Sequence, residues 1–232
     1  MASTPPTNEA FLREVDEELR KDQMQSLWQR YGKIAVAAVV LVLAAWGGWI
    51  YWQDRQIKAS GIEGEKLTQA VEDLQAGNPD VASAKLNTLS ASDNEGYRAT
   101  ARMGQASLML QKGNAKGAAA KFAEVAKDDD IAQPWRDLAL IRQTSVEFDT
   151  MKPQDVVTRL QPLAVKGSPW FGSAGELVAA AYLKMNKRDL AGTLFGEIGN
   201  DEGVPQSIRS RAVQMAGALG VDAVQLPAKD TQ

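Results

Sequence analysis

Residues Ala179–Phe195 read AAAYLKMNKRDLAGTLF and decide the fold of the chain. Apolar residues recur at helical spacing on both sides of a polar turn at Asn186–Arg188, which predicts two antiparallel helices. Ala191 opens the second helix, and Phe195 follows it four residues later on the same face. A small residue lets two helices approach closely, and an aromatic residue fills the space between neighbouring pairs. The stretch therefore predicts a helical hairpin that stacks on similar hairpins.

The same hairpin recurs along the chain. The residue that opens each second helix is small, and it returns after 36, 38 and 35 residues, at Ala82, Ala118, Val156 and Ala191. This period is close to that of a tetratricopeptide unit, about 34 residues. Phe122 stands four residues after the second of these positions and so repeats the A-x3-F spacing. Ala179 and Tyr182 precede the last pair at the distances that the tetratricopeptide motif sets.

We therefore expect an all-α chain in which residues 53–220 form a tetratricopeptide-like helical solenoid of about four helix pairs plus a C-terminal helix. The register of the third pair stays open by one turn, and an irregular all-α bundle is the alternative fold. The expected helices cover approximately residues 56–74, 81–89, 95–111, 118–125, 135–148, 156–163, 173–185, 190–198 and 206–219.

An apolar run precedes this domain. Ile34–Trp52 reads IAVAAVVLVLAAWGGWIYW, 19 residues without a charge, and a helix needs about 20 to cross a bilayer. Aromatic side chains that would settle at the two headgroup levels stand near both ends, at Trp28, Tyr31, Trp49, Tyr51 and Trp52. The sequence predicts a single transmembrane helix over residues 34–52. Small residues within it would let another transmembrane helix approach, at Ala44, Gly47 and Gly48.

A cleaved signal peptide is the alternative to an uncleaved anchor. The run is longer than the usual 7–15 apolar residues of a signal peptide, and it follows 33 residues that include acidic groups. Basic residues flank both ends, with Arg20, Lys21, Arg30 and Lys33 before the run and Arg55, Lys58 and Lys66 after it. The slight excess before the run predicts a cytoplasmic N-terminus and an outer C-terminal domain.

The two ends of the chain carry weaker signals. Residues 1–33 form the expected cytoplasmic tail, and part of it is an amphipathic helix with an acidic face of Glu14, Asp16, Glu17 and Glu18. That face favours partner docking over lipid docking, although a solvated face is the plain alternative. Residues 221–232 have no helical period, and we expect a flexible tail there.

The composition excludes several classes of chemistry. The chain has no histidine and no cysteine, which removes imidazole bases, thiol nucleophiles, disulfides and His- or Cys-ligated metal sites. The formal net charge is −3, which does not indicate a nucleic-acid surface. Asp128, Asp129 and Asp130 are the best carboxylate cluster, and we interpret them as a solvated turn. An anchored hydrolase of the Ser-Lys type is the enzyme alternative; no Ser-x-x-Lys motif follows the apolar run. We expect no catalysis, cofactor, metal or small-molecule substrate.

The solenoid predicts binding instead. Tetratricopeptide-like solenoids present a concave groove lined by the first helix of each pair, where segments of other proteins dock. Met103, Leu110 and Leu183 should face that groove. Burial in the core is the alternative for all three, because Met and Leu at helical spacing are usually core residues.

Several stretches together resemble a known family. The acidic tail, RYGK at residues 30–33, GGWIYWQDRQ at 47–56 and the repeat at 179–195 are similar to the YfgM-type tetratricopeptide proteins, ancillary subunits of the bacterial SecYEG translocon. The resemblance implies a single-pass inner-membrane protein with periplasmic repeats. It implies protein partners, namely the translocon, periplasmic chaperones and translocating clients, and no catalytic residues. A scaffold for cell division or envelope assembly would use the same architecture and remains the alternative.

Overall fold

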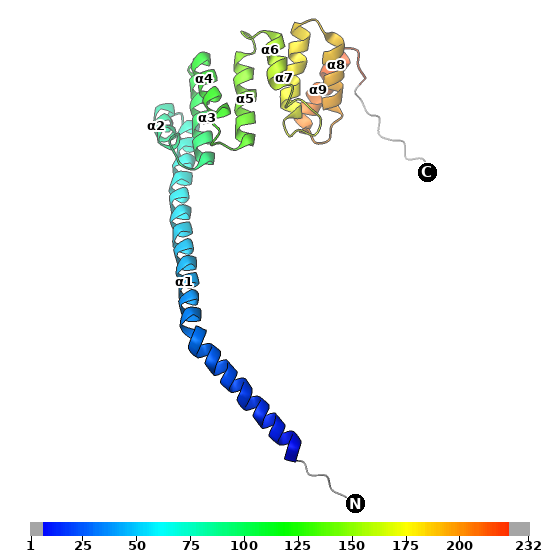
Figure 1. The fold of residues 1–232 in the computed structure, drawn as a ribbon. Coiled ribbons are helices and arrows are strands. Elements are labelled where there is room, and N and C mark those ends of the chain that lie inside the picture. The colour runs from blue at the N-terminus through cyan, green and yellow to red at the C-terminus, as the bar shows by residue number, and fades with distance from the viewer. Residues whose placement is uncertain (1–6, 223–232) are drawn as a thin grey trace, which may run out of the picture. The chain divides into compact units, whose positions relative to one another are not determined.

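Helices form all the regular structure of the described part of the chain. This computed structural model describes the backbone of residues 7–222, and the side chains of that range except 7–31, 34–36, 39 and 56–59. Two units make up the chain, Met1–Gly61 and Ile62–Gln232. The helices within residues 7–222 are α1 (Thr7–Gln75), α2 (Pro79–Leu89), α3 (Glu95–Gln111), α4 (Ala115–Ala126), α5 (Gln133–Glu147), α6 (Pro153–Leu160), α7 (Phe171–Lys184), α8 (Arg188–Gly199) and α9 (Gln206–Ala218) (Figure 1).

The first helix, α1, runs through both units without a break. From sequence alone we divide the same residues into a tail, a membrane span and the first repeat helix. In the first unit, the large apolar side chains from Val40 to Trp52 are 53–70% exposed. Among the residues that the structure describes, none of the helices combines the length and the apolar character of a membrane span. The span at 34–52 therefore stays a prediction. The side chains of Trp28, Tyr31 and the acidic face, and the tail residues 223–232, lie outside the described residues.

Three of the helices that come first in a pair, α1, α3 and α7, are followed by a residue in the left-handed conformation. These residues lie in the polar turns that the sequence predicts. Gly77, Gly113 and Asn186 have φ values of +77°, +75° and +57°. The steric cost of this conformation is lowest for glycine and asparagine, and the conformation lets the chain turn back after a helix. Asn94 and Asn114 then cap the N-termini of α3 and α4, because their side chains accept backbone N–H groups of the first turn.

The small residues that open the second helices lie at helix contacts, as predicted. Ala82, Ala118, Val156 and Ala191 are all fully buried. The two aromatic residues of the A-x3-F motifs, Phe122 and Phe195, are 2% and 4% exposed. The repeat pattern therefore identifies the core positions of α2, α4, α6 and α8.

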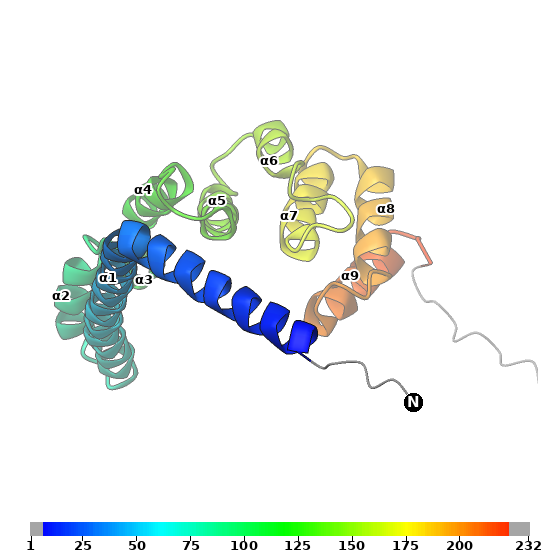
Figure 2. The same ribbon diagram turned by 60° about the horizontal axis from the view of Figure 1, so that its bottom comes forward.

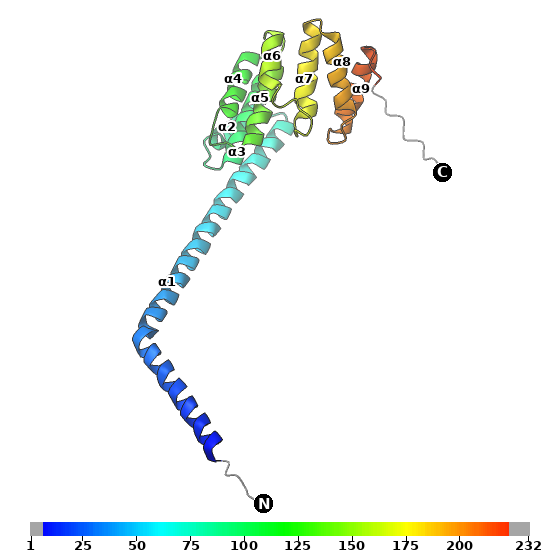
Figure 3. The same ribbon diagram turned by 45° about the vertical axis from the view of Figure 1, so that its right-hand side comes forward.

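Residues 62–222 form a stack of helix pairs. In Figure 2, α4, α6 and α8 lie in one row and α5, α7 and α9 in the other. Each apolar cluster is shared between consecutive helices. One cluster joins α1, α2 and α3, and another joins α7, α8 and α9. Figure 3 shows α7, α8 and α9 side by side. Residues 62–222 therefore form an all-α solenoid rather than an irregular bundle.

The third pair is the least regular. Helix α6 ends at Leu160, about one turn before the expected end at Leu163. It packs against α7, and it meets α5 through an apolar cluster and through the ion pair of Arg159 with Glu147 at 2.6 Å. Val156 is buried in that cluster, which settles the register of this pair.

Candidate partner-binding site

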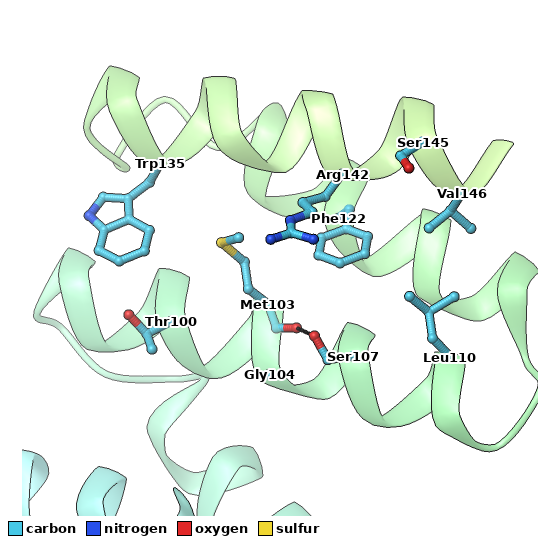
Figure 4. Close-up of a pocket in the computed structure, with 10 residues that line it drawn as sticks. All are labelled: Thr100, Met103, Gly104, Ser107, Leu110, Phe122, Trp135, Arg142, Ser145 and Val146. Carbon is cyan, nitrogen blue, oxygen red and sulfur yellow. Dashed lines mark hydrogen bonds between the residues drawn. The ribbon is translucent and has the colours of Figure 1, made fainter. Parts of the chain in front are cut away.

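A slot separates α3 from α5 on the surface of the solenoid. Helix α4 packs against both of these helices and closes the slot from behind. Figure 4 shows α5 on one side of the slot and α3 on the other, with side chains of both pointing into it. The cavity measures about 400 Å³ and is lined by Thr100, Met103, Gly104, Ser107, Leu110, Phe122, Trp135, Arg142, Ser145 and Val146.

Apolar side chains make the floor and the ends of the slot. Phe122 reaches in from α4 and is almost fully buried. Met103 is half-buried and packs against two core clusters, one of which contains Phe122. Trp135 lies at one end, and Leu110, which is 38% exposed, lies at the other (Figure 4). The slot therefore offers an apolar surface next to the core.

The polar groups of the slot differ in whether they are already bonded. The hydroxyl of Thr100 donates to the carbonyl of Gly96 at 2.8 Å, and that of Ser107 donates to the carbonyl of Met103 at 3.1 Å. Arg142 is exposed, and within the described part of the chain its guanidinium has no ion-pair or hydrogen-bond partner. Ser145 follows three residues later on the same face of α5, and its hydroxyl makes no bond to a described residue.

Residues 25–215 match the family described as tetratricopeptide repeat-like domain. The chain belongs to this family. Neither a curated protein nor a solved structure matched the chain. Tetratricopeptide repeat-like solenoids are protein-interaction modules with extended binding surfaces, so the family favours the slot as a binding surface.

In this tetratricopeptide repeat-like chain, two residues of the aspartate triplet form ion pairs with neighbouring helices: Asp128 with α3 and Asp129 with α5. Asp128 accepts a 2.7 Å bond from Arg102 and lies 3.7 Å from Arg98, so the turn after α4 is tied to α3. Partial burial acts to raise the pKa of Asp128. The bond from Arg102, the backbone N–H of Asp130 and the two arginine charges outweigh it, and the pKa falls below its usual value. Within the described residues, no cluster of acidic groups is arranged to hold a metal ion.

The structure brings two of the three predicted groove residues together. Met103 and Leu110 both line the slot. Leu183 lies elsewhere, half-buried against the cluster that joins α7, α8 and α9. Contact of these residues with a partner stays a prediction. Along the predicted span, a Cβ added at Gly47 or Gly48 would meet no described atom within 4 Å.

Sequence reasoning missed the whole α5 side of the slot, which consists of Trp135, Arg142, Ser145 and Val146. Trp135, Arg142 and Val146 recur at i, i+7 and i+11, which is the spacing of a single helix face. That spacing could have identified them. Leu140 and Ile141 obscured it, because they place apolar residues on other faces of α5.

Proposed function

We propose that this chain is a protein-binding module anchored in the bacterial inner membrane through residues 34–52. Its N-terminus is cytoplasmic and its repeats are periplasmic. It acts there as an ancillary subunit of the SecYEG translocon, connects emerging proteins with periplasmic chaperones, and carries out no catalysis. The resemblance of four stretches of the chain to YfgM-type proteins supports this assignment, and the tetratricopeptide repeat-like family supports the binding role.

The exposure of the apolar part of α1 is the observation that carries the proposal. Between Val40 and Trp52 the large apolar side chains point away from the helix on every side, and 53–70% of their surface is open. A helix that is apolar all round needs either a protein core or lipid around it. Exposed apolar surface costs about 25 cal/mol per Å² in water, so a bilayer would stabilise this segment strongly.

The C-terminal end of this segment carries the kind of side chains that proteins place at the headgroup layer of a bilayer. The rings of Trp49 and Trp52 lie 5.9 Å apart. The guanidinium of Arg55 lies 5.1 Å from the centre of the Tyr51 ring. Aromatic rings next to a cation are typical of the boundary between hydrocarbon and water. These contacts support an anchor that ends close to Trp52.

Cross-linking in intact membranes, followed by mass spectrometry of the partners, tests the proposal. We expect SecYEG subunits and periplasmic chaperones among the proteins joined to the full chain. Partners confined to cell-division or envelope-assembly proteins would refute the translocon role and favour the scaffold alternative.

A further inference from the structure

We infer that the slot between α3 and α5 receives a short extended segment of a partner protein, in which an apolar side chain stands beside an acidic one. The apolar side chain lies over Phe122 next to Met103, and the acidic side chain pairs with Arg142. This inference rests on the proposed protein-binding function and specifies the chemistry of the partner.

The dimensions of the slot favour an extended segment. Its lining residues run from Thr100 to Leu110 on α3 and from Trp135 to Val146 on α5. At a rise of 1.5 Å per residue, each side of the slot is about 15 Å long. An extended chain of four or five residues covers that length. A helix is about 10–12 Å wide with its side chains and would have to fit much of that width into a cavity of about 400 Å³, whereas an extended segment needs to place only the side chains of one face there.

The charge of the slot favours an acidic side chain. The other arginines of α3 and α5 are paired within the fold: Arg98 and Arg102 with Asp128, and Arg136 with Asp129. Arg142 lines the slot, and no described carboxylate pairs with it. A carboxylate that enters the slot therefore gains a guanidinium without displacing an internal partner. Ser145 can donate a second hydrogen bond from the next turn of α5, and bonds to ionised groups are the strong ones.

The apolar surface of the slot provides the second recognition element. Leu110 is 38% exposed at the rim, and Met103 has an unbranched side chain that can adjust to the shape of an incoming group. The floor at Phe122 is fixed in the core. An aliphatic or aromatic side chain can therefore enter between Met103 and Leu110 and lose contact with water.

Selection from a random peptide display library on the purified full chain, held in detergent micelles, tests the inference. We expect the selected peptides to share an apolar residue beside Asp or Glu. One such peptide is then synthesised with a fluorescent label, and its dissociation constant is measured by fluorescence anisotropy. Arg142→Glu should weaken binding tenfold or more, because it removes a bond to a charged group and adds repulsion. Exchange of the peptide's acidic residue for Lys should restore binding to that variant.

Two further variants show whether the peptide binds in the slot or elsewhere on the surface. Arg188→Glu changes another exposed arginine, at the start of α8 and outside the slot, and should leave the dissociation constant unchanged. Ser107→Trp fills the slot from an exposed position and should abolish binding while the thermal melting of the helices is retained.

Several results would overturn the inference. These are selected peptides without an acidic residue, equal binding to the Arg142→Glu chain, or failure to select any peptide. Membrane cross-linking with the Arg142→Glu chain separates this inference from the proposed function. If that variant keeps every partner, the slot is refuted and the binding module stands. If the unaltered chain captures no translocon or chaperone partner, the proposed function is refuted.

Discussion

Ala191 is the residue at which the packing of the repeat can be tested most simply. It is fully buried where α8 begins to contact its neighbours. Ala191→Trp should lower the free energy of unfolding by about 1–3 kcal/mol or more, because extra volume in a packed contact forces the helices apart. Urea denaturation of the full chain, followed by circular dichroism, measures the change.

Leu190 provides the matched control for this substitution. It precedes Ala191 on α8 and is 50% exposed. Leu190→Trp should change the free energy of unfolding by no more than about 0.5 kcal/mol. Equal effects of the two substitutions would contradict the packing of α8.

Because of Asp128, the free energy of unfolding depends on pH in the acid range. Its pKa is lowered in the folded chain, so the unfolded chain binds the proton more readily. The contribution of the carboxylate to stability is therefore complete above about pH 4 and disappears as the pH falls through the folded pKa. Asp128→Asn should destabilise the chain at pH 7 by about 1–2 kcal/mol, through the bonds with Arg98 and Arg102.

The measurement for Asp128 is the free energy of unfolding of both chains between pH 7 and pH 2. The difference between them should shrink towards the acid end. Asp129→Asn is the control, because the Asp129 side chain is 94% exposed and its surface ion pair with Arg136 contributes little. A difference for Asp128→Asn that stays constant over the whole range would contradict the account.

Leu110 and Met103 should respond differently to a polar substitution. Leu110→Asn changes a rim residue, and we expect weaker partner capture with an unchanged melting temperature. Met103→Asn changes a residue that also packs against two core clusters, so it should weaken capture and lower stability as well. Cross-linking yield and thermal melting, measured on both variants, check this. Loss of folding by Leu110→Asn would show that this residue belongs to the core.

Helix α9 is the last helix of the described residues, and it covers an apolar cluster of the solenoid. Ala212 and Ala216 on α9 cover the cluster that contains Phe195 and Ile198. A chain that ends at Asn200 exposes this cluster, and terminal repeats need a polar outer face. We expect faster amide hydrogen exchange throughout α7 and α8 of the truncated chain. A chain that lacks only residues 223–232 is the control, and unchanged exchange after the larger deletion would contradict the capping role.

The helix boundaries show how far the sequence specifies the elements. The bounds of α3 were predicted from the sequence because its signals are local: Asn94 caps one end, and Gly113 follows the other. Helix α1 contains glycines, among them Gly47, Gly48 and Gly61, but none of these three adopts a positive φ, and the helix continues through them. Hydropathy separates its segments, but it does not interrupt the helix. Local signals therefore predict where helices stop, whereas a change of hydropathy along a helix does not end it.

The binding site was less accessible from the sequence than the fold. Met103 and Leu110 were found because α3 has an unambiguous register. Arg142 was missed because apolar residues cover several faces of α5, so that only its packing on α4 selects the face that meets the slot. Leu183 has the same helical spacing as a groove residue, but it packs against the cluster that α9 completes. Tertiary contacts decide these positions.

The proposed orientation of the whole chain in the membrane can be measured directly. Under the proposed orientation, protease added to spheroplasts should remove the residues beyond about position 55 and leave a short protected N-terminal fragment, because the basic residues before the apolar run would keep that end in the cytoplasm. Immunoblots against tags at each end identify the fragments. Digestion of the domain only after lysis of the inner membrane would reverse the orientation.

A comparison of an anchored and an unanchored chain tests whether the proposed membrane anchor brings the repeats to their partners. Both chains are exported to the same compartment: the full chain, and a chain that lacks residues 1–55. The yield of each cross-linked partner is then measured in living cells. Tethering raises the effective concentration near a membrane complex towards about millimolar, so the shortened chain should lose most of its partners. Equal capture by the two chains would contradict the account.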